Sequence, residues 1–327
     1  MLVIDHQDAT RAFTMRRALD VMRETLVALD RGEGLQPLRT MMRLPNDGDA
    51  FWIMPSHVSG TLGVKVLTAF SGNAGTGFDT HQGAVLLFGA HGELLAMVDA
   101  TAMTAIRTAA VSGVATDALA REDAHVLAIL GSGAQAIAHA EAVLSVRAIT
   151  QVRVWSRTSA NAERFAHEVA AQFGTEVSVC DSVHRAVRDA DVVCTTTAAH
   201  TPILQGAWLR PGTHVNAVGS GSAADREVDG ATMRSARIFV DRMESAMREA
   251  GDVLLAIAEG AITADDVIGD LGGVLVGRLQ GRRAADEVTL FKSVGLGAED
   301  VAAARATYEE CVRLRLGREV AFGGVSS

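Results

Sequence analysis

The chain has 327 residues, of which 48% are hydrophobic, 21% are charged and 4% are aromatic, and its formal net charge is −9. This length suits about two domains of ~150 residues each, and the hydrophobic content is too high for a disordered chain. No apolar run approaches the ~20 residues of a membrane span, and the N-terminus lacks the basic and apolar blocks of a signal peptide. The negative charge argues against nucleic acid or an anionic membrane as the main partner. Three cysteines without metal-type spacing predict free thiols in a cytoplasmic protein.

The first stretch, to about residue 99, has the pattern of a mostly antiparallel sheet with one helix. Apolar residues at helical spacing over 14–30 predict a helix that Gly32 ends. Four closely spaced apolar runs predict strands, and the last two flank a hairpin-type connection. An Ala-rich helix follows them. The expected strands are 51–54, 63–70, 83–88 and 94–98, and the Ala-rich helix covers about 100–120.

The second stretch alternates strands with helices, which indicates a parallel, doubly wound sheet. A third stretch, from residue 295, contains a polar-faced helix over about 300–316. The predicted fold class is therefore α/β: a Rossmann doubly wound parallel sheet plus a mixed, mostly antiparallel α+β domain. The expected strands of the parallel sheet are 126–130, 151–155, 176–179, 192–196, 214–218 and 237–240.

A glycine-rich turn, Gly131-Ser132-Gly133-Ala134-Gln135-Ala136, directly follows the strand 126–130. Two glycines at this spacing let the backbone turn tightly and approach a pyrophosphate, and the N-terminus of the next helix offers its N–H groups. A tight turn without any ligand would explain the same glycines. The strand before the turn and the helix after it favour dinucleotide binding.

The end of the second parallel strand reads Trp155-Ser156-Arg157-Thr158 and carries no acid. A carboxylate at this position binds the ribose 2′-hydroxyl of NAD, whereas a guanidinium can engage a 2′-phosphate with two hydrogen bonds. The alternative is that Arg157 is simply a solvent-exposed loop residue. The pattern favours NADP over NAD.

Three basic residues stand among apolar neighbours: Arg39, Lys65 in a strand, and Arg107 in the Ala-rich helix. Burial of a cation is unfavourable unless it meets an anion. Internal carboxylates would satisfy these residues, and a lysine can also reach water. Three such residues near a predicted cofactor site nevertheless favour an anionic substrate. The histidines show no metal-binding pattern, and His81 stands where a strand begins.

Motifs along nearly the whole chain resemble those of the ornithine cyclodeaminase/mu-crystallin family, which includes an archaeal type of alanine dehydrogenase and the ketimine reductases. They include Gln-Pro-Leu-Arg-Thr at 36–40, Thr-Ala-Ile-Arg-Thr-Ala-Ala at 104–110 and Phe-Lys-Ser-Val-Gly at 291–295. Met54-Pro55, Lys65, the glycine-rich turn and Val-Asn-Ala-Val-Gly at 215–219 complete the set.

The resemblance implies a homodimer. A domain over 1–110, completed by a C-terminal helix over 296–327, would hold substrate and form the dimer interface, and a domain over 111–295 would bind NAD(P). It implies that Arg39, Lys65 and Arg107 bind the substrate carboxylate, with Lys65 as the candidate catalytic residue. The implied cofactor contacts are Thr80, His81, Arg107, Thr108, Gly131, Gly133, Ala134, Gln135, Ser156, Arg157, Thr158, Thr195, Thr196, Thr197, Val218, Gly219 and Ser220.

One departure from the family bears on the reaction. The cyclodeaminases and the archaeal alanine dehydrogenase carry an aspartate shortly after the 215–219 motif, and the aligned residue here is Gly221. Asp225 lies a turn further on, where a loop acid or a helix cap is expected. Members similar to mu-crystallin and to bacterial cyclic-imine reductases also lack that acid. The resemblance therefore implies NAD(P)H-dependent reduction of a cyclic ketimine, Δ1-pyrroline-2-carboxylate or Δ1-piperideine-2-carboxylate, to L-proline or L-pipecolate.

Three other functions stay open at this stage. The chain would be an ornithine or lysine cyclodeaminase if Asp225 replaces the missing acid. It would be an amino-acid dehydrogenase, similar to alanine dehydrogenase or of the opine type, if it acts on open-chain substrates. It would be a non-enzymatic NADPH- or ligand-binding protein if its substrate site were inactive. The sequence predicts neither the ring size of the substrate nor the proton donor.

Overall fold

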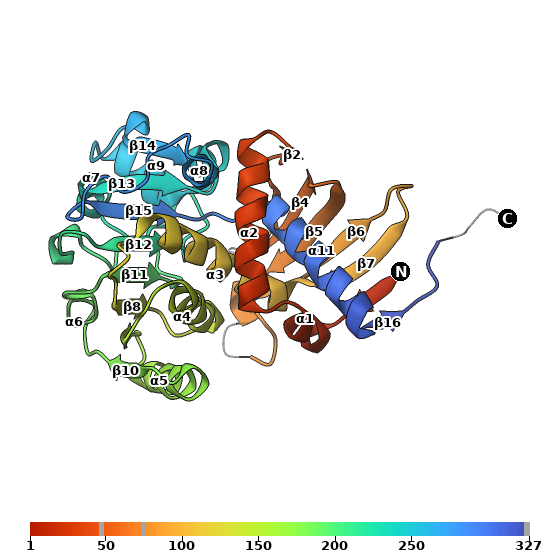
Figure 1. The fold of residues 1–327 in the computed structure, drawn as a ribbon, viewed down its shortest axis with the longest axis horizontal. Helices are drawn as coiled ribbons and strands as arrows, with labels where there is room; N and C mark the ends of the chain where they lie inside the picture. The colour runs from red at the N-terminus through yellow and green to blue at the C-terminus, as the bar shows by residue number, and fades with distance from the viewer. Residues whose placement is uncertain (46–48, 74–75, 324–327) are drawn as a thin grey trace. The chain divides into compact units, whose positions relative to one another are not determined.

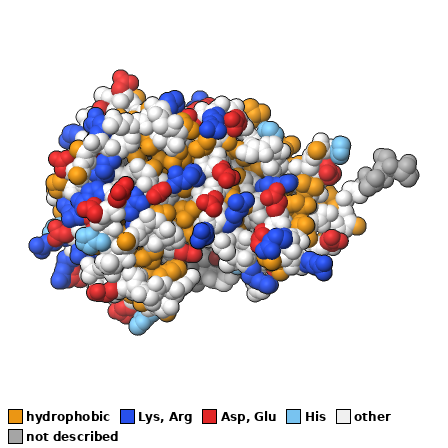
Figure 2. All heavy atoms as spheres, viewed as in Figure 1, with side chains coloured by type: hydrophobic (Ala, Val, Ile, Leu, Met, Phe, Trp, Pro, Cys, Tyr) orange, Lys and Arg blue, Asp and Glu red, His pale blue; other side chains and the backbone are white. Residues whose placement is uncertain are grey.

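The computed structural model describes residues 1–45, 49–73 and 76–323. The chain divides into two compact units, which we call unit 1 (Met1–Arg107 with Leu296–Ser327) and unit 2 (Thr108–Gly295). Helix α3 (Ala100–Leu119) carries the chain from unit 1 into unit 2. None of the described helices is long and apolar enough to cross a membrane. Charges of both signs are interspersed over the face of the molecule in Figure 2.

Unit 1 contains a mixed sheet in which β1 runs parallel to β7 and the other pairings between its described strands are antiparallel. The strand order is β16-β1-β7-β6-β5-β4-β2, and β3 pairs with β4. This arrangement confirms the predicted mixed, mostly antiparallel domain. The strands are β1 (Leu2–Ile4), β2 (Gly34–Leu35), β3 (Thr40–Arg43), β4 (Ala50–Val58), β5 (Thr61–Ala69), β6 (His81–Phe88), β7 (Leu94–Asp99) and β16 (Arg318–Glu319).

One face of this sheet is covered by α11 (Gly297–Leu314), which packs on β4, β5 and β6 and against α2 (Met15–Asp30) (Figure 1). The short helix α1 (His6–Ala12) also contacts α11. The predicted polar-faced helix over 300–316 is present as α11, whose exposed side carries Arg305, Glu309 and Arg313, and the buried first half of the helix includes Glu299 and Asp300. The predicted C-terminal helix over 296–327 ends at Leu314, where Arg315 adopts a positive φ of 56°.

Unit 2 contains a sheet of eight parallel strands in the order β10-β9-β8-β11-β12-β15-β13-β14. The predicted parallel sheet is confirmed, but the predicted set of strands stopped too early. Two further strands follow β13, and β15 lies between β12 and β13. The strands are β8 (Val126–Leu130), β9 (Gln151–Trp155), β10 (Glu176–Val179), β11 (Val192–Thr195), β12 (His214–Ala217), β13 (Ala236–Val240), β14 (Val267–Asp270) and β15 (Val288–Lys292).

Helices pack on both faces of the parallel sheet, as a doubly wound fold requires. Strand β8 shows this directly: Ala128 and Leu130 face one apolar core, and Leu127 and Ile129 face the other. The first core includes residues of α6 (Val183–Val187), α7 (Gly230–Ser235), α8 (Met243–Glu249) and α9 (Gly251–Ala258), and the second includes residues of α4 (Ala134–Val146) and α5 (Ser159–Phe173). The remaining helical segments are η1 (Ser71–Asn73), η2 (Gly206–Trp208), η3 (Ala264–Asp266) and α10 (Leu271–Leu275).

Candidate functional site

The glycine-rich turn of unit 2 lies between the end of β8 and the start of α4. Gly131 has a φ of +125°, and a Cβ at this position would stand 2.6 Å from Thr196 Oγ1, so a larger residue does not fit. Gly133 is the N-cap of α4 and makes no side-chain capping bond. A Cβ on Gly133 would meet nothing within 4 Å, so the first turn of α4 faces open space. This geometry suits an anionic group at the helix N-terminus.

A cavity of about 490 Å³ opens beside this turn, at the carboxyl edge of the parallel sheet. The ends of β8, β9 and β11 provide its walls, as expected for a nucleotide site in a doubly wound fold. Arg157 is exposed at the cavity, and Ser132 donates a hydrogen bond of 2.8 Å to Ser156. The lining residues are Gly131, Ser132, Gly133, Trp155, Ser156, Arg157, Thr196, Thr197, Ala198, Ala199, His200, Thr201 and Ile203.

The chemistry of this lining fits a dinucleotide. A helix N-terminus can receive a pyrophosphate, and Trp155 and Ile203 offer apolar surface. None of the lining residues that the structure describes is an aspartate or a glutamate, so the lining itself presents no carboxylate to a 2′-phosphate.

Other predicted cofactor residues lie near the cavity or in unit 1. Thr195 is fully buried and Ser220 is 4% exposed, so both are largely hidden from a ligand. Thr80, His81 and Arg107 belong to unit 1, and Thr108 is the first residue of unit 2. The cavity lining that the structure describes does not include Ala134, Gln135, Thr158, Thr195, Val218, Gly219 or Ser220.

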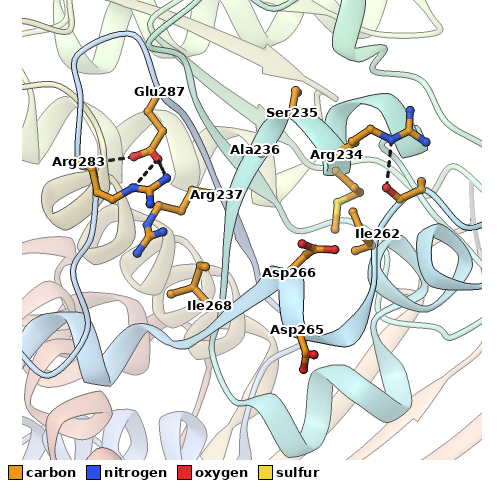
Figure 3. Close-up of a pocket in the computed structure, with 12 residues that line it drawn as sticks. Arg234, Ser235, Ala236, Arg237, Ile262, Asp265, Asp266, Ile268, Arg283 and Glu287 are labelled. Atoms are coloured by element: carbon orange, nitrogen blue, oxygen red, sulfur yellow. Dashed lines mark hydrogen bonds and ion pairs between the residues drawn. The ribbon is translucent and has the colours of Figure 1, made fainter.

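A second cavity, of about 410 Å³, lies at the amino edge of the same sheet, where β13 begins. Figure 3 shows that charged side chains of both signs line it. The Arg283 guanidinium is 2.7 Å from the Glu287 carboxylate, and Arg234 donates a hydrogen bond to the carbonyl of Ala261. These internal partners make this cavity a weaker candidate for an anionic ligand than the cavity at the carboxyl edge.

In unit 1, two of the three predicted cations meet in one buried cluster. Lys65 and Arg107 both contact the same oxygen of Asp300: Lys65 Nζ lies 3.0 Å and Arg107 Nε 2.9 Å from Asp300 Oδ1. Arg107 Nη1 also lies 2.8 Å from Glu299 Oε2. Lys65 donates a further hydrogen bond of 2.8 Å to Thr104 Oγ1. The sequence analysis left open whether internal carboxylates pair with these cations. Glu299 and Asp300, both in α11, are such carboxylates.

The charge state of Lys65 depends on this cluster. Burial lowers the pKa of the Lys65 ammonium from 10.5 to about 8, Asp300 opposes the decrease, and the like charge of Arg107 adds to it. Glu299 also acts to raise this pKa. Lys65 therefore remains mostly protonated at neutral pH and titrates within a few units of it.

The third predicted cation, Arg39, packs on an aromatic ring of unit 1. Its guanidinium lies 5.0 Å from the ring centroid of Trp52, a cation–π distance. The ring of Trp52 makes an edge contact with that of His81 at 6.2 Å. His81 Nδ1 is 3.1 Å from Thr80 Oγ1. The pKa of the His81 imidazole is lowered by partial burial of the ring and by the positive charge of Lys65. Arg39 and His81 are thus linked through Trp52.

The loop after β12 contains the position where the family resemblance expects an aspartate. Gly221 is exposed, and a Cβ there would meet nothing within 4 Å. Asp225 is partly exposed, and its Oδ1 lies 2.8 Å from Nδ1 of His200, a residue that lines the cavity at the carboxyl edge of the sheet. Asp225 therefore has a local partner in unit 2.

Sequence reasoning missed the carboxylates that organise both regions. Glu299 and Asp300 are at the start of α11, and Glu227 is in a loop without any periodic pattern. Lys292 carried a usable signal, because it ends the strand Val-Thr-Leu-Phe-Lys and is as unexpected there as Lys65 is in β5. All three cysteines are free thiols, as predicted. Among the residues that the structure describes, no group of three His, Cys, Asp or Glu side chains could hold a metal ion.

The sequence profile of the ornithine cyclodeaminase/mu-crystallin family matches residues 2–314. Ketimine reductase mu-crystallin of Mus musculus is 40% identical over 281 residues, which cover 85% of this chain and 86% of the mouse protein. Delta(1)-pyrroline-2-carboxylate reductase of Bacillus cereus is 35% identical over 326 residues, which cover 98% of this chain and all of that protein.

The fold is also similar to a solved structure. Delta(1)-pyrroline-2-carboxylate reductase of Thermococcus litoralis, in complex with NADH and L-proline, superposes with a TM-score of 0.96. It is 33% identical to this chain, and the match covers 98% of this chain and 100% of the other.

Proposed function

We propose that this chain, which belongs to the ornithine cyclodeaminase/mu-crystallin family, is an NAD(P)H-dependent reductase of cyclic ketimines. Its substrates would be Δ1-pyrroline-2-carboxylate or Δ1-piperideine-2-carboxylate, and its products L-proline or L-pipecolate. The observation that carries the proposal is the full-length similarity to the pyrroline-2-carboxylate reductase of Bacillus cereus. The buried cations of unit 1 and the nucleotide cavity of unit 2 support it.

The substrate carboxylate is assigned to Lys65, Arg107 and Arg39. Lys65 and Arg107 are 2% and 5% exposed and already face two carboxylates, so this part of the cluster is close to neutral. An ammonium has three N–H donors, and Thr104 and Asp300 accept two from Lys65, which leaves one for a substrate oxygen. Arg39, which packs on Trp52, is the third residue of this assignment.

The dinucleotide is assigned to the cavity at the carboxyl edge of unit 2. Gly131 and the first turn of α4 would receive the pyrophosphate. Arg157 and Ser156 would bind a 2′-phosphate, which supports a preference for NADP over NAD. When bound, the reduced nicotinamide supplies the hydride that the imine carbon accepts. The other cofactor contacts that the family resemblance implies are part of the same proposal. They are Thr80, His81, Arg107, Thr108, Gly133, Ala134, Gln135, Thr158, Thr195, Thr196, Thr197, Val218, Gly219 and Ser220.

The residues of the chain orient the substrate and need not supply a strong acid. A cyclic iminium enters already protonated on nitrogen, so the site must fix its carboxylate and exclude competing geometries. Gly221 offers no proton-transfer group at the position of the family aspartate, and Asp225 is already paired with His200. The position of the family aspartate therefore provides no base for the oxidation of an amine, which a cyclodeaminase requires. Lys65 is assigned as the catalytic residue because its ammonium would contact the substrate.

The quaternary structure is proposed to be a homodimer formed by unit 1. The face of its sheet opposite α11 is apolar over four neighbouring strands, β4 to β7. Val64 lies opposite Pro55 and Leu86, and Leu86 lies opposite Met97. Cross-strand partners point to the same side of a sheet, so these residues form a continuous patch, and Met97 is 36% exposed. A second copy of the same face would cover this patch.

Three free thiols support a cytoplasmic location.

The test measures NADPH consumption by the purified protein on Δ1-pyrroline-2-carboxylate, Δ1-piperideine-2-carboxylate and open-chain 2-oxo acids with ammonia. We expect turnover on at least one cyclic imine, with the L-product identified by chiral chromatography. Ammonia release from L-ornithine without net change in the cofactor would identify a cyclodeaminase. NADPH binding without turnover on any imine would identify a ligand-binding protein. Either result would contradict the proposal.

A further inference from the structure

A single buried carboxylate, that of Glu227, joins two loops at the carboxyl edge of unit 2. Its Oε2 accepts hydrogen bonds from Thr195 Oγ1 at 2.6 Å and from the Gly219 N–H at 2.7 Å. Its Oε1 accepts from the Thr197 N–H at 2.7 Å and from Thr197 Oγ1 at 2.6 Å. Each oxygen therefore receives one backbone N–H and one hydroxyl. The loop after β11 and the loop after β12 are held by the same side chain.

This carboxylate is expensive to bury unless its hydrogen bonds are complete. Glu227 has no exposed surface. Burial raises the pKa of its carboxyl group, and the hydrogen bonds from Thr195 and Thr197 act in the opposite direction. Apolar packing would fill this space without such a desolvation cost. The arrangement therefore fixes a specific geometry and is more than a filler of the core.

The geometry that Glu227 fixes is that of a wall of the nucleotide cavity. Thr196 and Thr197 line the cavity directly. Gly219 approaches the same loop so closely that a Cβ would stand 2.1 Å from the Thr197 carbonyl oxygen. Thr197 Oγ1 also accepts a hydrogen bond from the N–H of Ala199, another lining residue. A change in the position of Glu227 would therefore move the cavity wall.

Two further buried charges hold Glu227 itself in place. Asp252 Oδ1 accepts hydrogen bonds from the backbone N–H groups of Glu227 and Val228, at 2.7 and 3.1 Å. Lys292 Nζ lies 2.9 Å from Asp252 Oδ2 and donates to the Ser220 carbonyl at 2.5 Å. Lys292, Asp252 and Glu227 are all fully buried. The ends of β11, β12 and β15 are thus tied together by charged groups.

We propose that Glu227 is a positioning residue for the dinucleotide, because its carboxylate holds the loop 195–199 against Gly219 in the arrangement that the bound cofactor requires. It acts through the loops, since its own side chain is fully buried. The inference rests on the proposed function only in taking the unit 2 cavity as the dinucleotide site. A direct binding measurement separates the two, because it needs no substrate.

The decisive variant is Glu227→Gln in the full-length protein. A glutamine amide has one carbonyl oxygen, so one of the two backbone N–H groups would face an NH₂ donor. We expect the Kd for NADPH, measured by calorimetry and by fluorescence of the bound cofactor, to rise about tenfold or more. Hydrogen exchange of the apo protein should quicken at 195–199 and 218–220. A Kd within about twofold of the wild type, with unchanged exchange, would overturn the inference. Failure of the wild type to bind NADPH would instead overturn the cavity assignment.

A matched control is Asp191→Asn. Asp191 is also a buried carboxylate of unit 2 that accepts two backbone N–H groups, from His125 and Val126, but it lies at the start of β11. Its substitution should lower the stability without changing the Kd for NADPH. Equal weakening of NADPH binding in both variants would mean that general destabilisation explains the effect, and would overturn the inference.

A second pair of variants decides the question if Glu227→Gln does not fold. Thr195 is fully buried and donates to Glu227 Oε2. Thr195→Val removes that donor at nearly constant volume, and Thr195→Ser retains it. We expect a severalfold rise in the Kd for NADPH for valine and recovery for serine. Identical Kd values for the two variants would contradict the inference.

Discussion

Two buried lysines, one in each unit, have similar sequence surroundings and different partners. Lys65 lies in the middle of β5, 2% exposed, and Lys292 ends β15, fully buried. Lys65 shares its carboxylate, Asp300, with a second cation, Arg107. Lys292 contacts Asp252 and a backbone carbonyl, and Asp252 in turn binds backbone N–H groups. The comparison teaches that burial of a cation alone does not indicate a substrate site. What distinguishes Lys65, the residue proposed to bind substrate, is that it shares its anion with a second cation.

The largest expected difference is between Lys292→Met and Lys65→Met. Lys292→Met leaves Asp252 buried without its cation and should lower the free energy of unfolding by about 3–5 kcal/mol. Lys65→Met leaves Asp300 paired with Arg107, so the protein should fold and bind NADPH while kcat/KM on cyclic imines falls about 10²–10³-fold. Urea unfolding, NADPH binding and steady-state kinetics measure these effects. A Lys65→Met enzyme with normal kcat/KM would remove Lys65 from the site.

The oligomeric state should change when a charge is placed on the apolar patch of unit 1 and should not change when one is placed on an exposed strand of unit 2. Leu86→Asp puts a charge in the apolar patch of unit 1, and the protein should sediment as a monomer in analytical ultracentrifugation. Val179→Asp is the control, because Val179 is 42% exposed at the edge strand of the unit 2 sheet. The control should keep the wild-type sedimentation coefficient. A Leu86→Asp protein that stays dimeric would place the interface elsewhere.

The preference between NADPH and NADH tests Arg157, an exposed arginine of unit 2. Arg157→Ala should weaken NADPH binding about tenfold and leave NADH binding nearly unchanged, since only NADPH carries the 2′-phosphate. Competitive titration with both cofactors measures the ratio. Arg164→Ala is a suitable control, because Arg164 is an exposed arginine of α5 that does not line the cavity. If both cofactors weaken equally, Arg157 does not bind the 2′-phosphate.

The pH dependence tests the shared anion in unit 1. The pKa of Lys65 is about 8, so kcat/KM should fall as the pH rises through this value and the ammonium loses its proton. Asp300 raises this pKa, so Asp300→Asn should move the alkaline limb about one unit lower. The ionisation of the free imine is the same in both proteins, so the difference between the two profiles reports on Lys65. An unmoved limb would show that Lys65 does not govern it.

The smallest expected effect concerns the loop after β12. Gly221 has room for a side chain, so Gly221→Asp should fold normally. It should introduce at most weak ammonia release from L-ornithine, because one carboxylate without its supporting contacts is a poor base. Asp225→Asn is the companion variant. If the wild type releases ammonia from ornithine and Asp225→Asn stops it, Asp225 has replaced the missing acid and the reductase assignment is wrong.

Local patterns predicted most of the architecture, because the apolar periodicity of a strand or helix is visible in its own residues, whatever element it packs against. The helix 14–30 and the alternating strands of unit 2 were found in this way. Strand β15 was missed although Val-Thr-Leu-Phe precedes Lys292, since the charged residue ends the apolar run. A lysine is tolerated at this buried position because it pairs with Asp252, a residue of α9 that lies far from it in the sequence.

From the sequence, only those site residues could be predicted whose charge differs from the character of their neighbours in the chain. Lys65 and Arg107 deviate, because each is a charge among apolar neighbours. Glu227, Glu299 and Asp300 do not deviate, because acids are common in loops and first helical turns. Their roles depend on contacts with residues up to 235 positions away, which no local pattern encodes.

Unit 1 is built from both ends of the chain, and this affects the order in which the two units fold during synthesis. Lys65 and Arg107 emerge from the ribosome long before Glu299 and Asp300, whereas unit 2 is continuous over 108–295. Cations cannot be buried at low cost without their carboxylates. We therefore expect the nascent chain to fold unit 2 first and to keep unit 1 open until α11 is released. A translation arrest before residue 296 would leave Lys65 of β5 and Arg107 of α3 without their carboxylates, and β5 without the helix that covers it.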